Sequence, residues 1–200
     1  MQHQQGCPRL LVNVKGKQKA NSLEASFTDK HYELVVACKK GDRQSQFKLY
    51  NLYAKSMYNT ALRIVQDEAE AADVLQEAFI DAFARLDSFR QESTFGLWMK
   101  QIVVNKSIST LRKRKLEIQP LEEGEEPAND EESENDIELQ VASIKQAIDR
   151  LPDGYRLVLT LYLLEGYDHE EIAHILRISE ATSRSQYLRG KRKLLNYLVN

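Results

Sequence analysis

Residues 168–194 read DHEEIAHILRISEATSRSQYLRGKRKL, and this stretch decides the fold of the C-terminal part of the chain. Asp168 and Glu171 have the spacing of a capping box, so a short helix is expected to begin after Asp168. A brief turn follows, and Ser179 can cap a second helix. Two helices joined in this way predict a helix-turn-helix.

The predicted second helix has two different faces. One is directed inward and carries small and apolar residues, namely Ser183, Tyr187, Gly190 and Leu194. The other carries Arg184, Ser185, Leu188 and Arg189. Arginine is suited to guanine O6 and N7 in a major groove, and serine accepts several bases, so this face can read a DNA sequence. The alternative from spacing alone is an ordinary helical hairpin with a solvated basic face.

Composition excludes several classes of protein. The chain has 200 residues, of which 42% are hydrophobic and 29% charged, so it can bury a core. No stretch approaches about 18 uncharged apolar residues, and the first residues lack the apolar segment of a secretion signal. Cys7 and Cys38 form neither a disulfide framework nor a four-ligand zinc site by themselves. We therefore expect a cytoplasmic protein without membrane insertion.

The distribution of charge is more informative than the net charge of −2. Residues 117–138 carry eleven acidic residues and no lysine or arginine. Residues 30–115 carry 15 basic against 10 acidic residues, and residues 139–200 carry nine against seven. Two basic segments are thus joined by a polyanionic linker, which we expect to be an extended tether. Nucleic acid is a plausible partner of the basic segments.

Helical periodicity runs through both basic segments, whereas strand signals are almost absent. The chain is therefore predicted to be all-α, with two small helical domains joined by a flexible acidic linker. The expected divisions are a disordered lead-in at 1–27, a first domain at 28–115, the linker at 116–137 and a second domain at 138–200. No internal repeat is evident.

Four helices are expected in the first domain. Thr28 or Asp29 can cap a short helix, and a longer one follows it. Asp67 can cap the third helix, and the fourth begins near Phe95 after a polar loop at 88–94. In the second domain we expect helices at 137–151 and 155–164 before the helix-turn-helix.

An aromatic residue beside cations offers a second nucleic-acid signal. The fourth helix carries Trp98, Asn105 and Lys106 and ends in a basic run. Aromatic side chains beside cations can hold unstacked bases of a single strand. Trp98 also stands at helical spacing from Phe95 and Ile102, so packing within the core is the stronger interpretation from this segment alone.

The residues needed for catalysis or metal binding do not occur together. His169 and His174 are separated by five positions, whereas a zinc-protease motif needs a separation of four. The acidic residues in 67–77 have no partner histidine, cysteine or glycine-rich loop beside them. We therefore predict no enzyme activity, no catalytic residue, no metal and no cofactor.

Taken together, the segments resemble an extracytoplasmic-function (ECF) sigma factor, a small bacterial subunit that directs RNA polymerase to promoters. The resemblance covers about 30–115 and 138–198. It rests on DVLQEAF at 73–79, FRQESTF at 89–95 followed by Trp98, VN at 104–105, LP at 151–152, EGY at 165–167, HEEIA at 169–173 and SEAT at 179–182. Each motif is weak by itself, but their order on both sides of such a tether is specific.

The resemblance implies a four-helix, region 2-like bundle and a region 4-like helix-turn-helix. The bundle would bind core RNA polymerase through the β′ clamp helices, and the second domain would meet the β flap. The expected polymerase-binding residues are Asp73, Gln76 and Glu77. The linker would enter the path of the RNA, as a mimic of nucleic acid. The sequence leaves open whether an anti-sigma factor is a further partner.

Promoter DNA would contact both domains, which would read the −10 and −35 elements and assist melting. The loop that captures a flipped −10 base would consist of Arg90, Gln91, Glu92, Ser93 and Thr94. The melted or adjacent DNA would lie along Trp98, Lys100, Gln101 and Asn105. The −35 element would be read by Thr182, Arg184, Ser185, Leu188 and Arg189, with Lys191 and Arg192 nearer the phosphates.

Three residues depart from the family pattern. Gln91 replaces a common loop glycine, Arg177 stands where the turn usually has glycine, and Ser183 stands where valine is usual. The main alternative function is a stand-alone helix-turn-helix regulator whose N-terminal bundle senses a ligand or dimerises. A helical adaptor or anti-sigma-like interaction protein is a further alternative. Residues 1–27 receive no role, and the sequence does not give the promoter, the genes controlled, the inducing signal or the true start codon.

Overall fold

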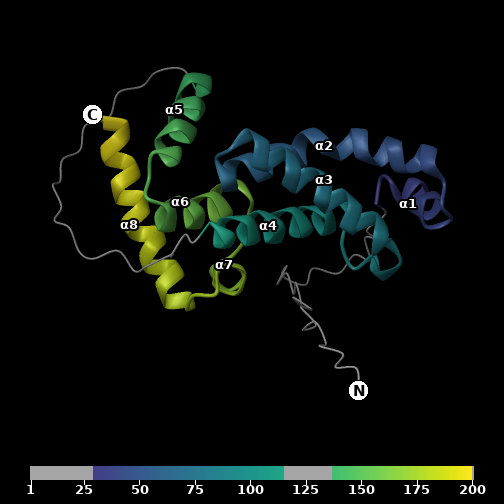
Figure 1. The fold of residues 1–200 in the computed structure, drawn as a ribbon. Helices are drawn as coiled ribbons and strands as arrows, with labels where there is room; N and C mark the ends of the chain where they lie inside the picture. The colour runs from purple at the N-terminus through teal and green to yellow at the C-terminus, as the bar shows by residue number, and fades with distance from the viewer. Residues whose placement is uncertain (1–28, 115–136, 200) are drawn as a thin grey trace, which may run out of the picture.

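The computed structural model describes residues 29–114 and 137–199, and every element within these ranges is helical (Figure 1). The expected all-α class is confirmed. The expected lead-in at 1–27 and the expected linker, apart from its last residue, lie outside the described residues.

The first unit contains α1 (Tyr32–Lys39), α2 (Arg43–Val65), α3 (Glu68–Ala84), a short 3₁₀ turn η1 (Leu86–Ser88) and α4 (Phe95–Lys113). Asp67 caps α3 as expected, because its carboxylate accepts the N–H of Glu70 at 2.8 Å. Asp42 caps α2 in the same way, accepting the N–H groups of Gln44 and Ser45. This cap on α2 was not among those predicted from the sequence.

The expectation that Asp29 caps α1 is wrong. His31 occupies the N-cap of α1 without a side-chain cap bond. The Asp29 carboxylate accepts the N–H of His31 at 2.9 Å and that of Phe95 at 2.7 Å. Because the first N–H groups of a helix lack partners within the helix, Asp29 satisfies one at the start of α4. Thr28 lies outside the described residues.

The second unit contains α5 (Ile137–Asp149), α6 (Asp153–Leu159), a π-helical turn η2 (Thr160–Leu164), α7 (His169–Leu176) and α8 (Glu180–Val199). A single helix had been expected over 155–164, but its second half widens into the π turn, in which the N–H of Glu165 donates to Thr160 at 3.0 Å. Gly166 follows with φ of +80°, a conformation in which glycine avoids the strain of a side chain.

The two units share one apolar core. The largest buried cluster contains residues of α1–α4 together with five from the second unit: Leu157, Val158, Leu161, Ile172 and Leu176. A smaller cluster joins Ala147, Ile148, Leu151, Leu159 and Leu194 within the second unit. Figure 1 shows the consequence, with α6 and α7 lying beside α4 and α8 crossing the end of the molecule. The two units therefore pack as one body.

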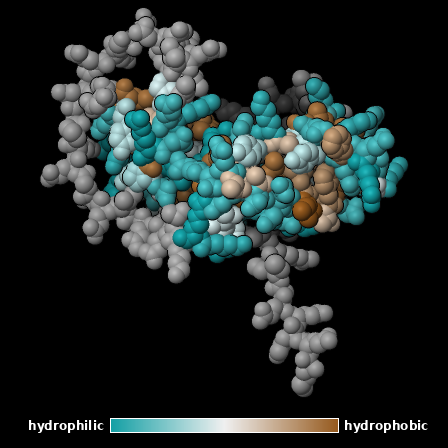
Figure 2. Space-filling model, turned by 45° about the horizontal axis from the view of Figure 1, so that its top comes forward, coloured by the Kyte–Doolittle hydropathy of each residue, from teal (hydrophilic) through white to brown (hydrophobic). Residues whose placement is uncertain are grey.

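The surface is mainly hydrophilic. On the face in Figure 2, apolar side chains interrupt the polar surface over the first unit. The most exposed large apolar residues of that unit are Phe47 and Ile80, with 66% and 67% of their surface accessible. No helix in the described part of the chain is both long and apolar enough to cross a bilayer.

Arg177 ends α7 in the left-handed conformation, with φ of 58° and ψ of 44°. The left-handed conformation explains why glycine is usual at this position of the turn. Its N–H donates to Ala173, so the conformation is fixed by the end of the helix. A Cβ atom in this region of φ and ψ crowds the backbone, which glycine avoids.

Replacing Arg177 by glycine should therefore stabilise the protein. We expect Arg177→Gly to raise the free energy of unfolding by about 1 kcal/mol relative to Arg177→Ala. Both variants lose the same charge, and only the alanine variant keeps the Cβ atom. Thermal denaturation followed by circular dichroism measures the difference, and equal stability of the two variants would show that the turn is not strained.

Candidate nucleic-acid and polymerase surfaces

The helix-turn-helix is held together by its caps and by small inward residues. Asp168 and Glu171 form the expected capping box, each side chain accepting the backbone N–H of the other at 2.8 and 2.9 Å. A Cβ atom on Gly190 would lie only 3.1 Å from Tyr155 and from Leu159, so glycine allows α8 to approach α6 closely. The inward face of α8 is confirmed, since Ser183, Gly190 and Leu194 are buried.

The opposite side of α8 places the expected −35 residues in solvent. Arg184, Ser185, Leu188, Arg189, Lys191 and Arg192 are exposed, with 58% of the Leu188 surface accessible. Arg184 pairs with Glu180 one turn earlier. Thr182 is half-buried, and its N–H donates to the hydroxyl of Ser179 at 3.0 Å, so it contributes to the start of the helix.

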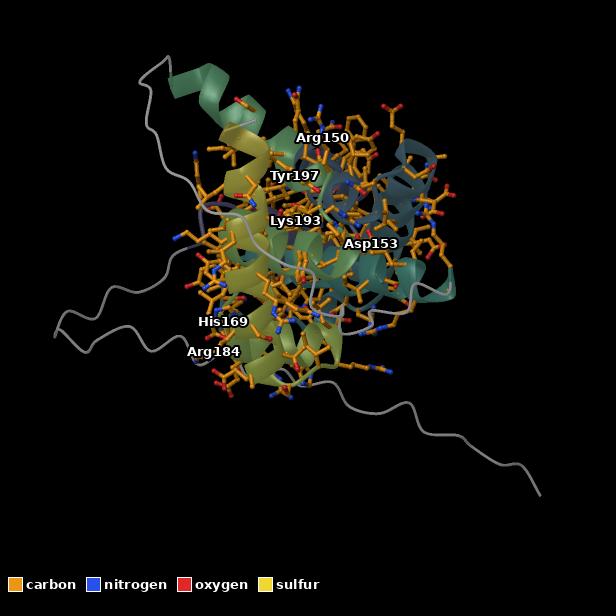
Figure 3. The ribbon with its side chains drawn as sticks, turned by 90° about the vertical axis from the view of Figure 1, so that its left-hand side faces the viewer. Arg150, Asp153, His169, Arg184, Lys193 and Tyr197 are labelled. Atoms are coloured by element: carbon orange, nitrogen blue, oxygen red, sulfur yellow. The ribbon has the colours of Figure 1, made fainter. Side chains whose placement is uncertain are left out.

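An aromatic cluster packs against the N-terminal half of α8. The His169 ring stacks on Tyr162 with centroids 4.7 Å apart and meets Tyr187 edge-on at 5.5 Å. Its Nδ1 atom lies 2.9 Å from the hydroxyl of Ser183, which is fully buried. The hydroxyl of Ser183, which stands where valine is usual, is therefore satisfied by His169. Figure 3 shows His169 and Arg184 together at the same end of α8.

The expected −10 loop is anchored at both ends. At its start Phe89 is buried, and its carbonyl accepts a hydrogen bond from Lys39 Nζ at 3.0 Å. At its end Thr94 caps α4 by accepting the N–H of Leu97. Gln91 within the loop has φ of 62°, the region that favours glycine, which explains why a glycine is common there.

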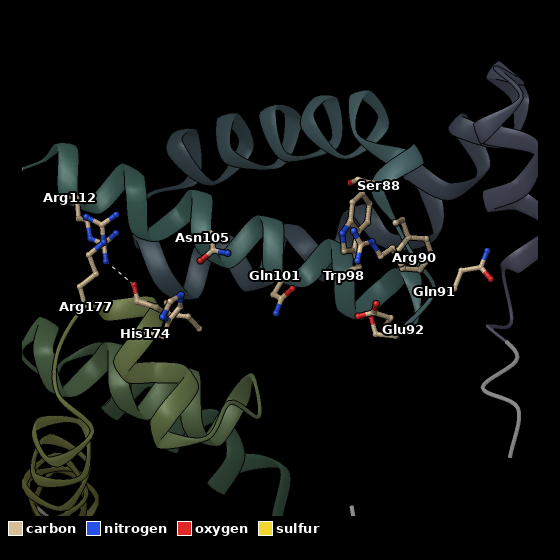
Figure 4. A pocket seen from close by; sticks show the side chains of 13 residues that line it. Ser88, Arg90, Gln91, Glu92, Trp98, Gln101, Asn105, Arg112, His174 and Arg177 are labelled. Carbon is tan, nitrogen blue, oxygen red and sulfur yellow. Dashed lines mark hydrogen bonds between the residues drawn. The ribbon is translucent and has the colours of Figure 1, made fainter. Parts of the chain in front are cut away.

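A groove runs from this loop along α4 to α7 (Figure 4). Its cavity has a volume of about 310 Å³. Most of the expected −10 residues line it, namely Arg90, Gln91, Glu92, Ser93, Trp98, Gln101 and Asn105. Trp98 is half-buried and packs on Phe89 and Phe95, with centroids 5.2 and 5.8 Å apart. Trp98 thus belongs to the core and also contributes to the groove.

The far wall of the groove comes from the second unit. His174, Ile175 and Arg177 line it opposite Arg112 of α4. Arg112 donates to the carbonyl of Ile175 at 2.7 Å, the bond drawn in Figure 4. Burial, and to a smaller extent the nearby Arg177 cation, lowers the pKa of Arg112. Sequence reasoning did not connect these residues, because they lie more than 60 positions apart.

Lys100 is one of two expected −10 residues that do not line the groove. It stands two positions after Trp98, about 200° around the helix, so the two side chains leave α4 on different sides. The Nζ atom of Lys100 lies 3.3 Å from Glu165 Oε2, which belongs to the second unit. Thr94 does not line the groove either, since it serves as the helix cap.

The expected polymerase-binding residues share an exposed face of α3. Asp73, Gln76 and Glu77 are all exposed, and Ile80 lies one turn further along. Glu77 pairs with Lys106 of α4 at 3.0 Å. Carboxylates beside an exposed apolar side chain can bind a basic protein surface. No group of three or more histidine, cysteine, aspartate or glutamate residues within 29–114 and 137–199 could hold a metal ion.

Comparison with known proteins matches both units. A family model described as Sigma-70 region 2 matches residues 49–117, and one described as Sigma-70, region 4 matches residues 142–194. The RNA polymerase sigma-H factor of Pseudomonas aeruginosa is 32% identical, with 80% of this chain and 89% of that protein covered. The ECF RNA polymerase sigma factor SigW of Bacillus subtilis is 30% identical, over 82% and 94%.

Solved structures support the fold. CnrH in complex with the cytosolic domain of CnrY has a TM-score of 0.51 at 21% identity, covering 83% of this chain and 95% of that one. The sigma factor RpoE of Bartonella quintana, in complex with the anti-sigma factor NepR, has a TM-score of 0.50 at 23% identity, covering 76% and 94%.

The fold, the two surfaces and these matches define a bacterial transcription initiation factor. The chain belongs to the ECF family of RNA polymerase sigma factors. It directs promoter-specific initiation by RNA polymerase, as the sequence resemblance had indicated.

The aromatic cluster should make stability depend on pH. Burial of the ring, followed by the Arg184 cation, lowers the pKa of His169 from its usual 6.5, against the opposing effect of Glu180 and Asp168. The unfolded chain then binds a proton more readily than the folded one. The contribution of neutral His169 to stability is therefore complete above about pH 6.5 and is lost as the pH falls through the lowered pKa.

We expect the free energy of unfolding of the wild type to fall more between about pH 7.5 and 5.5 than that of His169→Gln. Urea denaturation at several pH values measures both curves. His174→Gln removes an exposed histidine of the same helix and should follow the wild type. A parallel fall in all three proteins would contradict the role of His169.

Proposed function

We propose that the two units divide promoter recognition between them. The unit at 28–115 binds core polymerase and captures the melted −10 element, and the unit at 138–200 reads the −35 element. The observation that carries this proposal is the pair of family matches, one to each unit. The chain acts in this proposal by binding and strand separation, without covalent catalysis, in the cytoplasm.

For −35 recognition, the exposed side of α8 enters the major groove. Arg184 and Arg189 stand five positions apart on the helix, and both are exposed. Arginine reads guanine through two hydrogen bonds, whereas Ser185 tolerates several bases. Lys191 and Arg192 then approach phosphates, which adds affinity without sequence preference.

For −10 capture, the groove beside α4 receives unstacked bases. Trp98 offers an aromatic surface, Gln101 and Asn105 offer amide groups, and Arg90 supplies charge at the loop. Unstacking a base costs a few kcal/mol, which stacking and hydrogen bonds must offset. The left-handed Gln91 shapes the loop at this point.

Polymerase binds the exposed acidic face of α3 in this proposal, and its basic clamp helices match the charge of Asp73 and Glu77. The second unit meets the β flap. RpoE of Bartonella quintana is described in complex with an anti-sigma factor. We propose that a partner of this kind also regulates the present chain.

Changing Asp73, Gln76 and Glu77 together to alanine should abolish binding to core polymerase, because the variant loses the exposed carboxylates that face the clamp helices. Size-exclusion chromatography with purified bacterial core enzyme measures co-elution. A control that changes Glu33 and Glu68 to alanine removes the same charge from other exposed positions and should co-elute. Co-elution of the triple variant would reject this assignment of the polymerase surface.

Arg184→Ala and Arg189→Ala should each relax −35 recognition by about 1–3 kcal/mol for the base pair concerned. Sequencing of random duplex DNA selected by the holoenzyme identifies the preferred element, and competition binding then measures discrimination. Lys193→Ala removes a charge from the same helix and should weaken binding equally for all sequences. Unchanged discrimination in both arginine variants would show that another surface reads the element.

A further inference from the structure

The helix α1 and the turn before it hold both ends of the proposed −10 loop. They precede the part of the chain that matches Sigma-70 region 2, residues 49–117. At the start of the loop, Lys39 Nζ donates to the carbonyl of Phe89 at 3.0 Å. At its end, the carboxylate of Asp29 accepts the N–H of Phe95 at 2.7 Å. We call Asp29 and Lys39 the loop anchors.

The anchor at Lys39 acts on the loop and on the groove together. Lys39 is half-buried at the end of α1, and its Nζ atom also lies 6.0 Å from the centre of the Phe89 ring. Phe89 packs on Trp98, which lines the groove, with ring centroids 5.2 Å apart. A hydrogen bond from a charged amine is stronger than one between neutral groups. Lys39 therefore fixes the backbone at which the loop begins and the ring on which Trp98 packs.

The anchor at Asp29 uses both oxygens of one carboxylate. Oδ1 accepts the N–H of His31 at 2.9 Å, and Oδ2 accepts that of Phe95. Nδ1 of His31 lies 2.8 Å from the hydroxyl of Tyr53. The ring of Tyr53 packs in turn on Phe95, with centroids 5.3 Å apart. A carboxylate fits this place because it offers two acceptors and no donor.

The loop between the anchors is exposed along most of its length. Arg90, Gln91 and Glu92 are open to solvent at the loop end of the groove (Figure 4). Gln91 has φ of 62°, a conformation that persists in a residue with a Cβ atom only where the surroundings hold it. Binding groups must also be held within a fraction of an ångström to be selective. The positions of the two loop ends therefore decide where the groups at 90–93 lie.

We propose that Asp29 and Lys39 are positioning residues for −10 recognition. They touch no base, and they set the shape in which the loop captures one. This role rests on the proposed function, because it takes the loop as the −10 reader. Loss of an anchor should reduce discrimination between −10 bases, whereas polymerase binding through the exposed face of α3 should be unchanged.

The hold on the loop is measured by hydrogen–deuterium exchange of the free, full-length chain. Asp29→Asn replaces one acceptor oxygen by an amide group that cannot accept from either N–H. Lys39→Met keeps the length of the side chain and removes its donors. In both variants the amides of residues 90–97 should exchange several-fold faster, and those within α2 and α3 should not.

Glu33→Gln and Lys40→Met are the matched controls. They make the same chemical changes at exposed positions of α1 and its C-terminal cap, and should exchange like the unchanged chain. Lys39→Arg keeps a cationic donor and should retain most of the protection. Circular dichroism verifies that helicity is unchanged in every variant.

Base discrimination is measured with holoenzyme reconstituted from purified bacterial core polymerase. Selection from random single-stranded DNA identifies the preferred −10 bases, and fluorescence anisotropy compares the selected strand with its single-base changes. Asp29→Asn and Lys39→Met should each lower the ratio of affinities about tenfold at a base that the loop reads, the order of one lost base contact. Lys39→Arg and both controls should keep the ratio. A merely structural loss would weaken every strand equally and leave the ratio unchanged.

Unchanged ratios in both anchor variants would overturn the proposal, even if exchange were faster. If Lys39→Met fails to co-elute with core polymerase, Asp29→Asn decides the question.

Arg90→Ala and Glu92→Ala separate this failure from that of the proposed function, because both residues lie in the loop. Lower ratios in these two variants but not in the anchor variants would leave the loop as the reader and reject the anchors. Unchanged ratios in all four variants would reject the loop as the −10 reader, and the positioning role with it.

Discussion

A carboxylate removed from water must find opposite charge or hydrogen-bond donors close by, and the arrangement of the two units depends on one such group. Among residues 29–114 and 137–199, the side-chain partners of the Glu165 carboxylate lie across the boundary, on α2 and α4. Because the carboxylate sits directly after the π turn η2, its position fixes how α6 and α7 approach the first bundle. The shared apolar core then closes around this point, with Leu157 and Ile172 joining the cluster of the bundle.

The recognition surfaces consequently differ in accessibility. The side of α8 proposed to read bases and the acidic face of α3 are open to solvent, whereas the groove beside α4 has a wall formed by α7. The three surfaces belong to one packed body, because the two units share an apolar core.

Sequence reasoning succeeded where the determining chemistry is local. The capping box at Asp168 and the cap at Asp67 were predicted because each is defined by residues only three positions apart. The core faces followed from helical periodicity. The partners of Glu165 could not be predicted, since they are 65 and 102 positions away and a buried charge leaves no periodic signal. Trp98, Gln101 and Asn105 of α4 were expected on one surface and do line one groove, but the wall formed by α7 was not expected. Lys100 was grouped with Trp98 by the family resemblance, whereas helix geometry directs the two side chains to different sides of α4.

The proposed −10 loop is anchored by two residues that lie outside it. Lys39 binds the carbonyl of Phe89 before the loop, and Asp29 binds the N–H of Phe95 after it. Neither anchor uses a side chain between 90 and 93, the stretch that would touch a base. Sequence changes in these four positions therefore leave the supports of the loop in place. If the loop contacts a −10 base as proposed, a substitution that changes the preferred base need not disturb the bundle, so promoter preference and folding can change separately.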